Sequence, residues 1–149
     1  MKVLFILNNA PDYRESFLNG LSKECELTVY AGSCKLFNLN NPSTRGSYSY
    51  FEFKHVKIFG IYFPLISFNK INFSTYDVVC CSFNPRNPFW IILFFLSSTK
   101  IKKKWIWWGQ IFGKHKSLIF SFLRKISLSK SSSILVYSNR IVNEIKSQF

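Results

Sequence analysis

Residues 2–32 carry the clearest indication of the fold, and they read KVLFILNNAPDYRESFLNGLSKECELTVYAG. Val3–Leu7 is a continuous apolar run, which is typical of a strand buried on both faces in a parallel sheet. Apolar residues at helical spacing within Phe17–Leu21 predict a helix, and Leu27–Tyr30 predicts a second strand. A strand, a helix and a strand in succession predict a parallel sheet with right-handed crossovers.

The same alternation returns after a less regular middle segment. Residues 38–47 carry Asn, Pro, Ser and Gly and predict a loop. The aromatic run Phe59–Phe68 either covers the sheet or faces a partner. The remaining predicted strands are Tyr50–Ile58, Asp77–Ser82, Lys104–Trp108 and Ser133–Tyr137, and the remaining helices are Phe89–Ser98, Ser117–Ser129 and one capped by Ser138.

Together these elements predict an α/β fold with one Rossmann-like domain over residues 1–149. We expect a doubly wound parallel sheet of about six strands with helices on both faces. In the helix predicted from residue 117 onward, Leu118, Phe122 and Ile126 share one face and are expected to point inward.

Two helix starts carry capping signals. Asp12 and Glu15 have the spacing of a capping box. Asn87 and Pro88 offer an N-cap and a proline at the first helical position.

The charge balance is strongly basic. The chain has 20 Lys and Arg residues against 7 Asp and Glu, a formal net charge of +13. Such a surplus either forms a solvated surface or attracts polyanions. Between residues 100 and 130 the cations lie among Trp, Phe, Leu and Ile, which indicates peripheral contact with an anionic membrane. These cations are Lys100, Lys102, Lys103, Lys104, Lys114, Lys116, Arg124, Lys125 and Lys130.

The sequence predicts no membrane-spanning segment and no signal peptide. The longest apolar run, Phe89–Leu96, is far shorter than the roughly 20 residues that span a bilayer. The apolar N-terminus is interrupted too early by Asn8, Asn9 and Pro11. We therefore expect a cytoplasmic location, peripheral at the inner face of the membrane.

Several chemistries lack their sequence signatures. The four cysteines form no CxxC pair, so they are interpreted as reduced core residues without a metal. There is no GxGxxG, no P-loop and no GxSxG motif. His55 and His115 have no matching nucleophile signature. We expect no bound cofactor, and the catalytic residues stay unassigned.

A ligand site is predicted at the carboxyl ends of the strands. In a doubly wound sheet, ligands bind where the strand order reverses, here between the first and fourth predicted strands. Arginines suit phosphate and amides suit hydroxyls, although each could also be a turn residue, a cap or a surface charge. The flanking loops hold Asn8, Asn9, Tyr13, Arg14, Asn84, Arg86, Asn87, Trp108, Gly109 and Gln110.

Four segments resemble the N-terminal domain of GT-B glycosyltransferases of the large retaining group. These are Met1–Gly32, YDVVCCSFNPRNP at 76–88, WIWWGQIFGK at 105–114 and SSSILVYSNRIVNEI at 131–145. They occur in the family's order and reach both ends of the chain. The resemblance implies an acceptor-binding domain whose C-terminal partner domain binds a nucleotide sugar, usually without a metal. The matching positions are Tyr13, Arg14, Asn84 to Asn87, Gly109 and Gln110.

Two departures from the family pattern matter. Relatives often have a histidine that contacts the reacting sugar where this chain has Gln110, and glutamine cannot shuttle a proton. The chain also ends where the nucleotide-sugar domain should begin. We therefore expect either a truncated product or a split enzyme with a separate donor-domain chain, and no sugar transfer by this chain alone.

The favoured function is the N-terminal half of a glycosyltransferase. It would transfer sugar from a nucleotide sugar to a glycan or lipid-linked acceptor in cell-surface polysaccharide synthesis. The alternative is a non-catalytic α/β module that binds a membrane or a partner. Nucleic-acid binding has only the charge in its favour and no recognisable motif, so no nucleic-acid partner is expected.

Overall fold

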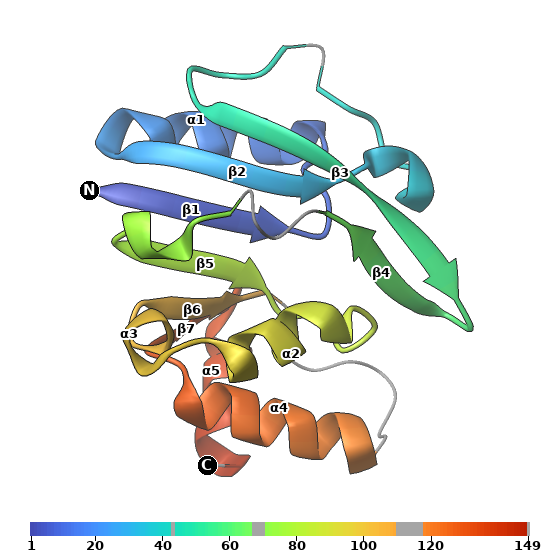
Figure 1. Cartoon of the computed structure of the whole chain (residues 1–149), viewed down its shortest axis with the longest axis vertical. Coiled ribbons are helices and arrows are strands. Elements are labelled where there is room, and N and C mark those ends of the chain that lie inside the picture. The colour runs from blue at the N-terminus through green and yellow to red at the C-terminus, as the bar shows by residue number, and fades with distance from the viewer. Residues whose placement is uncertain (43, 67–70, 110–117, 149) are drawn as a thin grey trace.

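The computed structural model describes residues 1–42, 44–66, 71–109 and 118–148 and has an α/β fold built on one seven-stranded sheet (Figure 1). The strands are β1 (Lys2–Leu7), β2 (Glu26–Gly32), β3 (Ser49–Ile58), β4 (Ile61–Leu65), β5 (Val78–Ser82), β6 (Trp105–Trp108) and β7 (Ser133–Leu135). The helices are α1 (Glu15–Glu24), α2 (Pro88–Leu96), α3 (Thr99–Lys102), α4 (Leu118–Lys130) and α5 (Asn139–Gln148). Single 3₁₀ turns are η1 (Asp12–Arg14), η2 (Cys34–Phe37) and η4 (Phe73–Thr75).

The strand order is β4-β3-β2-β1-β5-β6-β7, and every neighbouring pair is parallel except β3 with β4. Without β4, this order is consistent with a Rossmann-like arrangement. The prediction that the first and fourth predicted strands are neighbours is confirmed, because β1 pairs with β5 from Val3↔Val78 to Ile6↔Cys81. The six predicted strands are present and pair in parallel, but the prediction missed a seventh strand, β4, which makes the sheet mixed. The aromatic run forms an antiparallel strand, because Phe59 and Gly60 adopt positive φ and reverse the chain.

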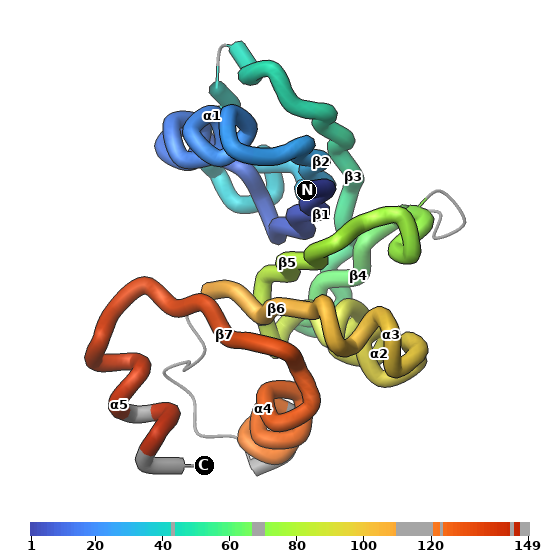
Figure 2. Tube along the Cα trace, turned by 90° about the vertical axis from the view of Figure 1, so that its left-hand side faces the viewer, coloured from blue at the N-terminus to red at the C-terminus, as the bar shows by residue number. Residues whose placement is uncertain are grey.

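Strand β1 separates two hydrophobic clusters. Leu4 and Ile6 pack on one side with residues of α2, including Trp90 and Phe94. Val3, Phe5 and Leu7 pack on the other side with Leu18 of α1. Figure 2 shows α1 and α2 on opposite sides of the sheet, so helices cover both faces.

The side-chain caps predicted for α1 and α2 do not form. The N-cap positions of α1 and α2 are Arg14 and Asn87, and neither makes a side-chain cap hydrogen bond, although Pro88 does occupy the first turn. The Glu15 carboxylate instead accepts from Gly46 N at 2.7 Å and from Tyr48 Oη at 2.8 Å. It serves as an anchor for the loop before β3, which is a long-range role that capping-box spacing cannot reveal.

Arg45 completes this anchor. Its Nη1 lies 3.1 Å from Glu15 Oε2 and donates to the Ala10 carbonyl at 2.9 Å. The guanidinium also lies 3.9 Å from the centroid of the Tyr50 ring. The ion pair is mostly shielded from solvent, so it links α1, the β1 loop and β3 more firmly than a surface pair would.

The inner face of α4 differs from the prediction. Phe122 is 64% exposed, whereas Ser127 and Leu128 are buried. Trp107 Nε1 donates to the Ser127 carbonyl at 3.2 Å and thereby sets which side of the helix faces the sheet. The side chain of Leu118 lies outside the described residues, and Ile126 is half-buried.

The four cysteines are unpaired, as predicted. Cys34, Cys80 and Cys81 are buried and Cys25 is half-buried. Burial raises the pKa of the Cys80 thiol to about 12, so it stays protonated at neutral pH. These side chains therefore act as core residues.

We expect Gly32→Ala to lower the free energy of unfolding by at least about 2 kcal/mol. A Cβ there would lie 2.1 Å from His55 Cε1 and 2.3 Å from the Asn8 backbone oxygen. Gly20 in α1 is the matched control, because a Cβ there meets nothing within 4 Å. Gly20→Ala should raise the free energy by about 0.5–1 kcal/mol, through the lower entropy of the unfolded chain. Urea unfolding measures both changes, and equal effects would contradict the close packing at Gly32.

Candidate functional site

Some of the predicted site residues join other side chains in two groups at the carboxyl edge of the sheet. The group named here the Arg14 cluster consists of Tyr13, Arg14, Trp108 and Tyr137, which lie after β1, β6 and β7. The Asn87 cluster consists of His55, Tyr62, Asn87 and Trp90, which come from β3, β4 and α2. The Asn87 amide also lies 3.5 Å from Asn8 Oδ1, so the loops after β1 and β5 meet as predicted.

In the Arg14 cluster, a guanidinium lies against aromatic rings. Arg14 Cζ is 5.0 Å from the Trp108 centroid and 5.8 Å from that of Tyr13. Arg14 Nη1 donates to the carbonyl of Asn9 at 3.2 Å. A guanidinium has five N–H donors, and the Asn9 carbonyl is the one acceptor it meets among the described residues. Within that part of the chain the other donors meet no acceptor, and their chemistry suits an anion or hydroxyl groups.

Aromatic packing holds this cluster in place. The Trp108 ring centroid lies 5.7 Å from that of Tyr137 and 5.2 Å from that of Phe5 in β1. Trp108 is buried, whereas Tyr13 is exposed. Burial raises the pKa of Tyr137, so its hydroxyl stays neutral. A half-buried cation therefore lies beside an exposed aromatic ring at the sheet edge.

The Asn87 cluster is a buried hydrogen-bond network. Asn87 is 1% exposed. With its amide nitrogen toward the Tyr62 carbonyl at 3.2 Å, its oxygen accepts from His55 Nε2 at 3.3 Å and from Trp90 Nε1 at 3.2 Å. Each polar atom of the amide then has a partner, as burial requires. The Asn87 side chain therefore joins β3, β4 and α2 and does not reach a ligand.

His55 is a neutral imidazole in this network. It donates through Nε2, so Nδ1 carries no proton, and Nδ1 is buried without a hydrogen-bond partner among the described residues. Burial lowers the pKa of His55 from 6.5 to about 4. The close approach of the ring to the β2 end is allowed because residue 32 is glycine.

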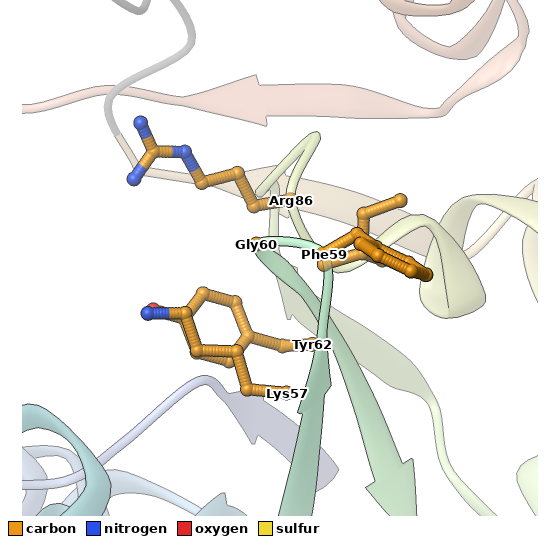
Figure 3. Close-up of a pocket in the computed structure, with 6 residues that line it drawn as sticks. Lys57, Phe59, Gly60, Tyr62 and Arg86 are labelled. Carbon is orange, nitrogen blue, oxygen red and sulfur yellow. The ribbon is translucent and has the colours of Figure 1, made fainter.

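Asn84 and Arg86 lie in the loop after β5. Asn84 Oδ1 accepts from Arg86 N at 3.0 Å, which is an Asx-turn and a structural role. The Arg86 side chain is exposed and lines a shallow hollow of about 390 Å³ with Lys57, Tyr62 and the Phe59-Gly60 turn. Figure 3 shows the Arg86 and Lys57 side chains extending to the same side of the hairpin. Two cationic residues therefore line one hollow that the sequence did not indicate.

The remaining predicted residues divide as follows. Asn9 is buried beneath Arg14. Gly109 is buried with φ of +130°, and its N–H donates to the Leu135 carbonyl at 3.1 Å. This conformation requires glycine and links β6 to β7, so the residue has a structural role. Gln110 lies outside the described residues.

His55, Lys57 and Tyr62 were missed as site residues. The alternation of Phe53 and His55 along the predicted strand was the only signal, and it showed burial without showing position. These residues reach the site because β3 runs past the edge of β2, where Gly32 pairs with Phe53. This length of overhang depends on strand register, which sequence patterns do not reveal.

The 100–130 stretch is only partly exposed where it is described. Lys102 Nζ donates to the Phe95 carbonyl at 2.8 Å, and Lys104 Nζ donates to the carbonyls of Ser74 and Tyr76. Lys100, Lys103, Lys125 and Lys130 are exposed, and Lys114 and Lys116 lie outside the described residues.

Within the described ranges, no three or more His, Cys, Asp and Glu side chains gather in a way that could hold a metal ion. The helices of the same part of the chain are all too short or too polar to cross a bilayer. Comparisons with protein-family models, with curated proteins and with solved structures gave no significant match. The function is therefore inferred from the geometry of the chain itself.

The low pKa of His55 predicts a loss of stability in mild acid. Between pH 6.5 and 4 the unfolded chain binds a proton that the folded chain excludes. The stability contributed by neutral His55 should therefore be fully present above pH 6.5 and be lost as the pH drops toward 4. We expect the free energy of unfolding to fall by about 2 kcal/mol between pH 7 and pH 5. Urea unfolding at both pH values measures this. His55→Gln, which keeps an N–H donor but does not titrate, should remove that loss. An equal loss in this variant would exclude His55 as the titrating group.

Proposed function

We propose that this chain is the acceptor-side half of a glycosyltransferase with GT-B architecture. The observation that carries the proposal is the Arg14 cluster, which lies at the carboxyl edge next to the point where strand order reverses. A guanidinium binds phosphate or hydroxyl oxygens through paired N–H groups, and the exposed Tyr13 ring offers an apolar face with a hydroxyl. These groups suit a sugar acceptor or the phosphate of a lipid-linked one.

In this proposal the chain binds and orients the acceptor. Arg14 and Tyr13 hold it in the first loop, and the exposed Arg86 contributes a second cation from the loop after β5. A donor-domain chain would supply the nucleotide-sugar site, and no catalytic residue is assigned to this chain. The exposed cations of the 100–130 stretch, with Phe122, would rest on the inner face of the membrane in cell-surface polysaccharide synthesis.

A second candidate is a non-catalytic module that binds a membrane or a partner. One observation favours it: Asn87, a predicted ligand-binding amide, is spent on His55, Trp90 and the Tyr62 carbonyl. Asn84 and Gly109 likewise have structural roles. A domain that has lost its substrate-binding function would retain such residues, because the fold needs them even without a substrate.

Purification of the tagged chain from its native host tests the first proposal. We expect a donor-domain chain to co-purify and the eluate to transfer sugar from a nucleotide sugar. Arg14→Ala should lower that activity at least tenfold, and Arg14→Lys should restore only part of it, since lysine lacks the planar fork. Tenfold corresponds to about 1.4 kcal/mol. Lys23→Ala, which removes an exposed cation from α1, is the control and should have wild-type activity.

Other outcomes would redirect the assignment. A chain that purifies alone, with no nucleotide-sugar turnover, would support the non-catalytic module. An active complex whose activity is unaffected by Arg14→Ala would support the transferase function. It would contradict the proposal that the Arg14 cluster binds the acceptor.

A further inference from the structure

The hairpin formed by β3 and β4 has an outer half that leaves the main sheet. Residues Ser49 to Phe53 pair in parallel with β2, and the pairing with β2 ends at Phe53. From Lys54 onward, β3 pairs antiparallel with β4, as far as Ile58↔Ile61. Figure 1 shows this part extending past the carboxyl ends of β1 and β2. The segment Lys54–Leu65 is called the hairpin arm below.

The two faces of the arm differ sharply. Cross-strand partners share a face, and successive residues alternate between faces. His55 with Pro64 and Lys57 with Tyr62 form the inner face, which meets the Asn87 cluster. The outer face is apolar except for Lys54, and four of its side chains are 39–58% exposed: Val56, Ile58, Phe63 and Leu65.

The tip of the arm is an exposed aromatic residue. Phe59 has φ of +48° and Gly60 has φ of +79°, so both turn residues are left-handed. Turns of this kind favour Asn-Gly, and a bulky aromatic residue rarely adopts this conformation. Phe59 is nevertheless 101% exposed, so the folded chain gains no burial from it. An aromatic ring held out in this way points to a surface outside the chain.

The charges of the arm indicate which surface that is. From Phe53 to Ile66 the chain carries Lys54 and Lys57 and no acidic residue. Arg86 adds a cation beside the tip, and Lys57 and Arg86 line the same hollow (Figure 3). Lys57 lies two residues before Phe59, which is about 7 Å along an extended chain, and apolar faces of peripheral elements enter the headgroup and acyl boundary to about 5–10 Å.

We propose that the hairpin arm inserts its tip into an anionic membrane. Phe59 and the outer apolar face enter the interface, and Lys57 and Arg86 remain at the level of the lipid phosphates. This surface is distinct from the 100–130 stretch. Binding to vesicles needs neither a donor chain nor sugar transfer, so this proposal and the proposed transferase function can fail separately.

Co-sedimentation of the full chain with lipid vesicles tests the proposal. We expect at least tenfold tighter binding to vesicles of phosphatidylcholine and phosphatidylglycerol (7:3) than to pure phosphatidylcholine. Raising NaCl from 0.05 to 0.5 M should weaken the anionic binding, since salt screens the cations. Lys57→Gln should reduce the preference for anionic vesicles. Equal binding to both vesicle types, or no binding to either, would overturn the proposal.

Phe59→Asn is the decisive variant. Asn-Gly suits the turn, so the variant should melt at the wild-type temperature or above it. It should nevertheless lose at least tenfold in affinity for anionic vesicles. Leu96→Asn, which removes a 79% exposed apolar side chain from the end of α2, is the control and should bind like the wild type.

Two results would overturn the assignment of the tip. Loss of binding in Phe122→Asn but not in Phe59→Asn would transfer membrane contact to the 100–130 stretch. A wild-type dimer that Phe59→Asn dissociates, without vesicle binding, would identify a second copy of the chain as the occupant. Quenching by bromolipids gives an independent readout: a Trp introduced by Phe59→Trp should be quenched, while the buried native Trp residues are not.

Discussion

The structure depends on the burial of β1 on both faces. All residues from Val3 to Leu7 are buried, and they alternate between the two hydrophobic clusters. Since each such side chain contributes about 1.5–3 kcal/mol when it leaves water, β1 is stable only if helices cover the sheet on both sides. Helix α1 therefore covers one face of the sheet, and α2 covers the other. The loops after β1 and β5 lie together, because these strands are neighbours.

The change of pairing partner along β3, from β2 to β4, determines the shape of the carboxyl edge. The strand pairs with β2 up to Phe53 and then pairs only with β4. This overhang carries His55 over the ends of β1 and β2, where the absence of a side chain at Gly32 leaves room for its ring. The same overhang exposes Phe59 and the outer apolar face. One change of pairing partner along β3 therefore produces both the buried Asn87 cluster and the projecting hairpin arm.

The two clusters at the carboxyl edge show how burial assigns roles to polar groups. The Asn87 amide is buried, so its hydrogen bonds must be made within the chain, and it becomes part of the scaffold. Arg14 is only partly buried, and among the described residues it donates one hydrogen bond, to the Asn9 carbonyl. Polar residues of the same predicted site thus differ in how fully the described part of the chain satisfies them, because their exposure differs.

The apolar pattern predicted the order and approximate limits of most elements, because burial of a strand or helix face leaves a period in the sequence. The sequence also identified the loops that flank the junction of β1 and β5, because a small set of rules restricts the strand order of such folds. It did not reveal that Phe59–Phe68 contains an antiparallel strand, that Glu15 anchors a distant loop, or that Phe122 faces solvent. These points, and the presence of His55 and Lys57 at the edge, become visible only in the folded chain. They depend on strand register and on contacts between residues far apart in the chain, which local patterns do not encode.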